Sequence, residues 1–197
     1  MYCRDPEKLR EAGFLDFGIQ TRPAASLGSE NVLQAQNTRR KKYTTQMDAA
    51  RKGIVTEELR KVAEKEHFEV NELMALVAEG KAAIPANKNH RCLDPNGIGS
   101  MLRTKINVNL GTSRDCKDLD MELEKVNYAV GMGAESIMDL SSWGDTQKFR
   151  RKLTAECPAI IGTVPIYDAV VYYHKPLKEI TSEEWIKIVE MHAQDGV

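Results

Sequence analysis

The feature that most constrains the fold is a strand–helix alternation in the second half of the chain. Three segments are typical of strands, because apolar residues dominate them or alternate with polar ones: 104–110, 136–141 and 159–165. Helical spacing of apolar residues falls between them, at 119–130 and 146–153, and a last helix opens at a capping box of Thr181 and Glu184. A strand–helix repeat of about thirty residues predicts βαβ units with right-handed crossovers, and therefore a parallel sheet.

Two architectures contain such units, a (β/α)8 barrel and a doubly wound sheet. Polar or tyrosine-bearing residues close the three strands: Asn107 and Asn109, Asp139 and Ser141, and Tyr167 and Asp168. In a barrel the carboxyl ends of the strands converge on one ligand-binding face, which favours the barrel. The doubly wound alternative lacks its Gly-x-Gly-x-x-Gly turn after the first strand.

The length of the alternating region limits how much of a barrel it can form. A complete barrel takes about 250 residues, whereas residues 103–197 hold about three βα units. We therefore expect an α/β chain whose residues 103–197 are the first part of a truncated (β/α)8 barrel. This predicts that the chain is the N-terminal part of a longer protein.

Two further regions precede the alternation. Thr56 is a predicted helix start, Asn71 a second, and Gly80 a helix stop, so residues 44–102 are predicted to form a small helical subdomain. Residues 1–43 carry a net charge of +3, against −4 for the remainder, and include a Gly/Ser/Asn/Gln-rich stretch. We interpret them as a poorly ordered extension or linker.

Composition and cysteine spacing exclude several functional classes. The net charge of −1 argues against a nucleic-acid partner, and no apolar run approaches the roughly 18 residues that span a bilayer. The four cysteines are too far apart in sequence for a local Cys-x-x-Cys metal site, and they form no disulfide framework. We expect a cytoplasmic protein, and we interpret His90 and Cys92 as an incidental pair and not as metal ligands.

Five ordered motifs carry a family resemblance that covers residues 44–197. They are 45–54 (TQMDAARKGI), 84–90 (IPANKNH), 105–113 (KINVNLGTS), 137–141 (IMDLS) and 162–167 (GTVPIY). In this order they resemble the phosphomethylpyrimidine synthase family, radical S-adenosylmethionine enzymes of thiamine pyrimidine synthesis. The resemblance implies a central (β/α)8 barrel and a small N-terminal domain.

The resemblance also implies a reaction. The family rearranges 5-aminoimidazole ribonucleotide to hydroxymethylpyrimidine phosphate, using a 4Fe–4S cluster that cleaves S-adenosylmethionine, with an additional divalent metal such as zinc. The family's clustered cysteines and metal-binding histidines match nothing in this sequence. We therefore expect no metal or cluster ligands in this chain and no turnover by the chain alone. The family further implies a homodimer for the full-length protein.

Three substrate-contacting positions of the family match Asn109, Met138 and Tyr167, which recur every 29 residues. An amide, a polarisable thioether and a phenol are suited to hold a nucleotide ring. Asn87 and Asn89, in the second motif, are weaker candidates. Each of the first three also has a structural alternative: a turn cap for Asn109, core packing for Met138 and turn packing for Tyr167.

The sequence leaves two other functions open. Trp143 and Asp168 depart from the commonest family pattern, and the segment from Asp168 to Lys178 is closer to paralogues that make 5-hydroxybenzimidazole, a cobamide lower-ligand precursor, from the same substrate. Because both products fit, the sequence does not separate them. The second alternative is a non-catalytic chain that retains part of the nucleotide pocket.

Overall fold

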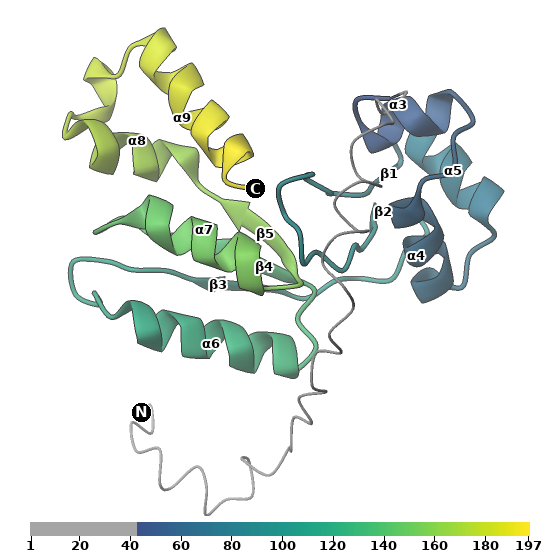
Figure 1. Ribbon diagram of the computed structural model, residues 1–197, viewed down its shortest axis with the longest axis horizontal. Helices are drawn as coiled ribbons and strands as arrows, with labels where there is room; N and C mark the ends of the chain where they lie inside the picture. The colour runs from purple at the N-terminus through teal and green to yellow at the C-terminus, as the bar shows by residue number, and fades with distance from the viewer. Residues whose placement is uncertain (1–42) are drawn as a thin grey trace, which may run out of the picture. The chain divides into compact units, whose positions relative to one another are not determined.

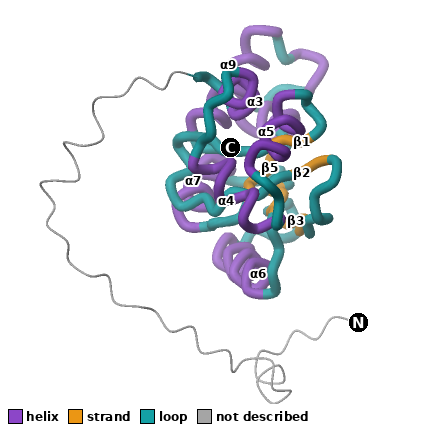
Figure 2. Tube along the Cα trace, turned by 90° about the vertical axis from the view of Figure 1, so that its right-hand side faces the viewer, coloured by secondary structure: helices purple, strands orange, loops and turns teal. Residues whose placement is uncertain are grey.

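The computed structural model describes residues 43–197, which belong to one compact unit that extends from Lys41 to Val197. The predicted extension at 1–43 therefore lies, apart from Tyr43, outside the described residues. Strand segments are short within the described part, and helices supply most of its regular structure (Figures 1 and 2).

The parallel sheet predicted from the alternation is confirmed. Its strands are β3 (Asn107–Leu110), β4 (Ser136–Asp139) and β5 (Ile160–Thr163), in the order β3-β4-β5 with both pairs parallel. The connecting helices are α6 (Leu119–Gly131) and α7 (Thr146–Glu156) (Figure 1). Three strands establish the α/β class, and their closure into a (β/α)8 barrel stays a prediction.

One face of this sheet is buried against α6 and α7. Leu110, Ile137 and Ile161 on successive strands pack in one core with Val126 of α6 and Phe149 of α7. The two helices begin where the sequence supplies a capping acid, because a carboxylate satisfies the unpaired amides of the first turn. Asp118 accepts from two amides of α6, and Asp145 accepts from the Lys148 amide of α7.

The region after β5 differs from the prediction. The predicted strand ran to residue 165, but β5 ends at Thr163 and Pro165 opens the helix α8 (Pro165–Tyr173). Proline suits the first helical position because its missing N–H would have no intrahelical partner there. The 3₁₀ turn η1 (Leu177–Glu179) leads to α9 (Ser182–Gln194), which has the predicted capping box of Thr181 and Glu184.

The helices in the region predicted to be a subdomain, residues 44–102, pack around a core of their own, and their separation from the sheet as a domain stays a prediction. Its helices are α3 (Gln46–Arg51), α4 (Glu57–Glu66) and α5 (Val70–Ala78), followed by the antiparallel pair β1 (Ala82–Ala83) and β2 (Ile98–Gly99). Thr56 caps α4 as predicted, by accepting from the Leu59 amide at 3.0 Å. Leu59, Val62 and Leu73 are buried in a cluster distinct from the one behind the sheet. Neither α3 nor the β1–β2 pair was predicted from the sequence.

Buried charges join the subdomain to the segment that leads into β3. Lys105 forms an ion pair with Glu66 at the end of α4, and both side chains are almost completely buried. Glu66 also accepts from the Arg103 amide at 2.7 Å. This pairing fixes the start of β3 against α4. Within residues 43–197, no helix has the length and apolar character needed to span a membrane.

Candidate functional site

The sheet face opposite α6 and α7 carries two of the side chains that the sequence analysis singled out, Asn109 and Met138. Along β3, Asn107 and Asn109 alternate with Val108 and Leu110, and the two asparagines are exposed while Leu110 is buried. The register pairs Asn109 with Met138 on β4, and Met138 with Gly162 on β5. Asn109 and Met138 are therefore neighbours on the same face of the sheet.

The missing side chain of Gly162 makes room for Met138. A Cβ atom added at Gly162 would lie 2.8 Å from the Cε atom and 3.0 Å from the Sδ atom of Met138. The thioether of Met138 thus extends sideways over β5 and is half-buried. A larger residue at position 162 would displace it, which makes this close approach a requirement of the observed arrangement.

A short chain of hydrogen bonds orients the asparagine amide. Ser136 donates to Asn107 Oδ1 at 2.9 Å, and Asn107 Nδ2 donates to Asn109 Oδ1 at 2.9 Å. Among the described residues, Asn109 Nδ2 has no acceptor, so its two N–H groups remain available to a ligand. The oriented amide can present these donors to a ring nitrogen or a hydroxyl group above the sheet.

The loops that follow β3 and β4 are tied together at the carboxyl edge of the sheet. The Thr112 amide donates to Ser141 Oγ at 3.0 Å, Thr112 Oγ1 donates to the Trp143 carbonyl at 2.7 Å, and the Ser142 amide donates to the Thr112 carbonyl at 2.9 Å. Gly111 precedes this junction at φ +136°, and a Cβ there would lie 2.5 Å from the Ser141 nitrogen. The edge next to Asn109 is consequently well fixed.

An aromatic side chain and a cation lie at the same carboxyl edge of the sheet. Trp143 is 40% exposed, and the Lys117 ammonium lies 4.8 Å from its ring centroid, within cation–π range. Trp143 follows β4 and Lys117 follows β3, so both belong to the loops that the Thr112 contacts join. The sequence singled out Trp143, whereas Lys117 carried no signal.

Tyr167 lies on a different kind of element from the other two candidates. It occupies the first turn of α8, five residues after Gly162, and is 47% exposed. Among the described residues, no hydrogen bond joins its phenol to Asn109 or Met138. The structure thus brings Asn109 and Met138 together and leaves Tyr167 at the carboxyl end of the next strand.

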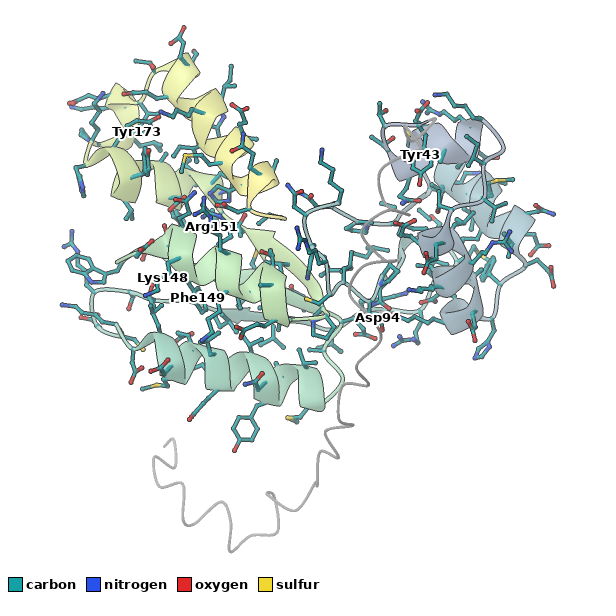
Figure 3. The ribbon with its side chains drawn as sticks, in the orientation of Figure 1. Tyr43, Asp94, Lys148, Phe149, Arg151 and Tyr173 are labelled. Atoms are coloured by element: carbon teal, nitrogen blue, oxygen red, sulfur yellow. The ribbon has the colours of Figure 1, made fainter. Side chains whose placement is uncertain are left out.

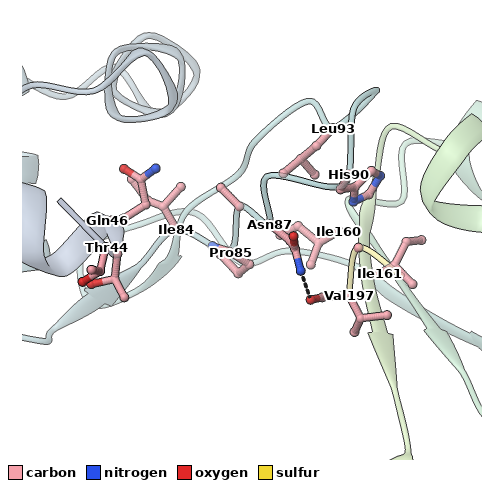
Figure 4. A pocket seen from close by; sticks show the side chains of 13 residues that line it. Thr44, Gln46, Ile84, Pro85, Asn87, His90, Leu93, Ile160, Ile161 and Val197 are labelled. Atoms are coloured by element: carbon pink, nitrogen blue, oxygen red, sulfur yellow. Dashed lines mark hydrogen bonds between the residues drawn. The ribbon is translucent and has the colours of Figure 1, made fainter. Parts of the chain in front are cut away.

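The two asparagines of the second motif bind the end of α9. Asn87 Nδ2 donates to the Ala193 and Val197 carbonyls, at 2.7 Å each, and Asn89 Nδ2 donates to the Gln194 carbonyl at 2.9 Å. The Gln194 carbonyl is one that a helix leaves unpaired at its C-terminal end, whereas the Ala193 carbonyl also accepts from the Gly196 amide and Val197 lies beyond α9. Asn87 also lines a cavity of about 360 Å³ (Figure 4). Both of its amide protons are already used, so only its carbonyl oxygen can accept further.

The His90–Cys92 pair is engaged with the main chain. His90 Nε2 is 2.7 Å from the Cys157 carbonyl, and Cys92 Sγ donates to the same oxygen at 3.2 Å. Burial raises the pKa of the Cys92 thiol, which disfavours the thiolate that binds metals. Within residues 43–197, no three His, Cys, Asp or Glu side chains are grouped so as to hold a metal ion.

A buried ionic network joins α7, α8 and α9 next to Tyr167, and nothing in the sequence predicted it. Arg150 of α7 is 1% exposed, and it donates to Asp168 Oδ2 at 3.1 Å and to Asp195 Oδ2 at 2.9 Å. Asp195, just after α9, also pairs at 2.7 Å with Arg151, on the α9 side of α7 (Figure 3). His192 Nε2 lies 3.0 Å from Asp168 Oδ2, so that α7, α8 and α9 meet at these charges.

The network sets the protonation of its acids. Burial alone would raise the pKa of Asp168, but hydrogen bonds from His192 and Thr146 together with the Arg150 charge lower it below the usual value. The pKa of Asp195 is likewise lowered, against its burial, by hydrogen bonds from Arg151, Arg150 and Gln147. Asp168 is thus a buried, paired carboxylate and not, as its place beside Tyr167 suggested, a side chain at the mouth of the site.

Comparison with known proteins supplies the family context of this geometry. The model of the Radical SAM ThiC family matches residues 45–197. Proteins named Phosphomethylpyrimidine synthase are 65% identical in Clostridium botulinum (strain Hall) and 64% identical in Clostridium botulinum (strain 657), each over 154 residues that make up 78% of this chain and 35% of the relative. The one from Clostridium novyi (strain NT) is 62% identical over 79% of this chain and 36% of its own length. The chain spans about a third of the length of these curated relatives.

Proposed function

The chain belongs to the Radical SAM ThiC family, and we propose that the whole protein rearranges 5-aminoimidazole ribonucleotide to hydroxymethylpyrimidine phosphate in thiamine pyrimidine synthesis. In this proposal the described residues contribute one part of the substrate pocket. The whole protein acts as a homodimer on this small-molecule substrate.

The observation that carries the proposal is the strand register. Asn109 and Met138 are paired positions on adjacent parallel strands, with their side chains on the sheet face that α6 and α7 leave uncovered. In a parallel α/β sheet, ligands bind near the carboxyl ends of the strands. Two of the three residues taken from the family resemblance therefore fall where this rule expects a ligand, and Tyr167 follows the carboxyl end of the third strand.

Each residue has a role that its chemistry permits. The unpaired Nδ2 group of Asn109 donates to a ring nitrogen or a ribose hydroxyl of the substrate. Met138 supplies a polarisable wall beside the imidazole. Tyr167 donates a hydrogen bond through its phenol, which α8 carries half-exposed. Asn87 and Asn89 act on the substrate only indirectly, because their amides hold the end of α9.

The cofactors of the family are not accommodated by the described residues. A 4Fe–4S cluster needs closely spaced thiolates, whereas Cys92, Cys116 and Cys157 are three free thiols, of which Cys92 donates to main-chain carbonyls and Cys116 to Glu122. No step of the reaction is therefore assigned to the cluster, to S-adenosylmethionine or to a divalent metal such as zinc through this part of the chain. What residues 43–197 supply is substrate positioning.

The test is product identification with the intact protein. Reconstituted protein is incubated anaerobically with S-adenosylmethionine, a reductant and 5-aminoimidazole ribonucleotide, and the product is identified by mass. We expect hydroxymethylpyrimidine phosphate. The paralogue product, 5-hydroxybenzimidazole, would transfer the proposal to cobamide lower-ligand synthesis. Absence of both products, despite a loaded cluster, would favour a non-catalytic role.

Substrate binding by two variants tests the placement of the substrate separately from the overall activity. Asn109→Ala removes the free donor and is expected to weaken substrate binding about tenfold, since one hydrogen bond to a polar ligand is lost. Asn107→Ala is the matched control, because that residue orients Asn109 without a predicted substrate contact, and it is expected to have a smaller effect. Equal binding by both variants and the parent protein would contradict the placement of the substrate on this face.

A further inference from the structure

Helix α8 is held at its N-terminal end by an unusual contact. Its N-cap residue, Val164, has no side-chain capping bond, and the Asp168 amide lies 3.5 Å from the Val164 carbonyl, at the limit of a hydrogen bond. The Tyr167 amide donates to the same carbonyl at 3.0 Å, so one backbone bond closes the first turn. The carboxylate of Asp168 adds the side-chain contacts that hold this turn against its neighbours.

Those contacts come from both neighbouring helices. Thr146 Oγ1, at the start of α7, donates to Asp168 Oδ1, and Arg150 Nη1 donates to Oδ2. His192 of α9 also contacts Oδ2, and its second ring nitrogen lies 2.8 Å from Thr163 Oγ1 at the end of β5. Hydrogen bonds to a charged carboxylate are directional, so three of them hold the carboxylate of Asp168 at a defined position.

A fixed Asp168 determines where its neighbour points. Consecutive side chains of an α-helix are separated by about 100° around the axis. With Asp168 held toward α7 and α9, α8 cannot rotate, and Tyr167 is directed to the exposed side of the same turn. The buried Ala169 adds contact but no directional constraint, because a methyl group forms no hydrogen bond.

We propose that Asp168, held by Arg150, Thr146 and His192, is a positioning residue that sets the orientation of Tyr167 for the substrate. This inference rests on the proposed function, in which Tyr167 contacts 5-aminoimidazole ribonucleotide. It assigns to Asp168 a role in substrate binding that involves no contact with the substrate. The same network links this role to α7 and α9.

The first experiment measures orientation without any ligand. The intact protein carries 3-fluorotyrosine at position 167, and its ¹⁹F resonance is recorded in the parent, in Asp168→Asn and in Asp195→Asn. Asp195 is the matched control, since it is a buried acid on the same Arg150 but lies beyond α9 and not on α8. We expect Asp168→Asn to shift or broaden the resonance and Asp195→Asn to leave it in place. An unchanged resonance in folded Asp168→Asn would overturn the inference.

The second experiment asks whether the effect on binding passes through the phenol. Calorimetric titration with 5-aminoimidazole ribonucleotide is made on Tyr167→Phe, Asp168→Asn and the double variant. We expect each single variant to raise the Kd about fivefold to tenfold, the effect of one hydrogen bond, and the double variant to bind no more weakly than Tyr167→Phe. Additive losses would mean that Asp168 acts independently of Tyr167, and would refute the positioning role.

The variants distinguish a failure of the proposed substrate contact of Tyr167 from a failure of the positioning role of Asp168. If Tyr167→Phe binds normally, the predicted substrate contact is wrong and the positioning role falls with it, whatever the fluorine signal shows. If Asp168→Asn does not fold, Thr146→Val removes a single bond to Asp168 while keeping every charge. A shifted resonance in Thr146→Val, with Kd raised less than in Tyr167→Phe, supports the inference, and an unchanged resonance there overturns it.

Discussion

Removal of Arg150 tests how much the buried network stabilises the fold. Arg150→Met keeps an unbranched side chain in place of the arginine stem but removes the guanidinium, which leaves Asp168 and Asp195 without their shared cation. Breaking a buried ion pair from one side costs about 3–5 kcal/mol, because a charge remains buried and uncompensated. Asp195 keeps Arg151 and Asp168 keeps His192, so we expect the lower end, about 3 kcal/mol.

The assay is urea unfolding of the chain, followed by far-UV circular dichroism and tryptophan fluorescence. With a denaturant slope of about 2 kcal/mol per molar, the loss lowers the midpoint by about 1.5 M. For a folded region of this size it also lowers Tm by about 6–12 °C. Lys152→Met is the matched control, because it removes the same charge from the exposed side of α7 and is expected to change stability by less than about 0.5 kcal/mol.

One result would refute the reasoning. If Arg150→Met and Lys152→Met unfold at the same urea concentration, the network contributes no net stability, and its attraction merely offsets the desolvation of its charges. Arg150→Lys adds a graded comparison. One ammonium cannot form the fork that reaches both carboxylates, so this variant is expected to fall between the parent and the methionine variant.

Three further predictions concern the buried acids and the glycine that follows β3. Asp168 and Asp195 have lowered pKa values in the folded chain, so the stability they contribute is fully present above the ordinary pKa of 3.8 and is lost as pH falls through the lowered values. Urea midpoints measured from pH 6 to pH 2 should therefore decline below about pH 3.8. Burial raises the pKa of Asp139, so its charge opposes folding at neutral pH; Asp139→Asn should raise the urea midpoint at pH 7, and a lower midpoint would contradict this cause. Gly111→Ala forces a Cβ against the backbone of the loop after β4 and should cost about 2 kcal/mol in thermal unfolding, whereas Gly131→Ala, with open space around it, should not destabilise α6.

Much of the fold could be predicted from short stretches of sequence. The parallel strands, α6, α7 and the capped starts of α4 and α9 are encoded by residues a few positions apart, through apolar spacing and side-chain caps. The face shared by Asn109 and Met138 also follows from local alternation, once the strands pair in parallel. Helix α8 was missed because its proline and short apolar run resemble the end of a buried strand.

The sequence by itself determined two things. The order of the motifs determined the family resemblance, and the alternation of strands and helices determined the α/β class. Tertiary structure decided which polar side chains form their hydrogen bonds within the protein and which remain available to a ligand. Asn87 meets carbonyls more than a hundred residues away, and Asp168 meets partners on two other helices. A side chain's chemistry is fixed by its residue type, but its availability to a ligand depends on hydrogen-bond partners that only folding brings within reach.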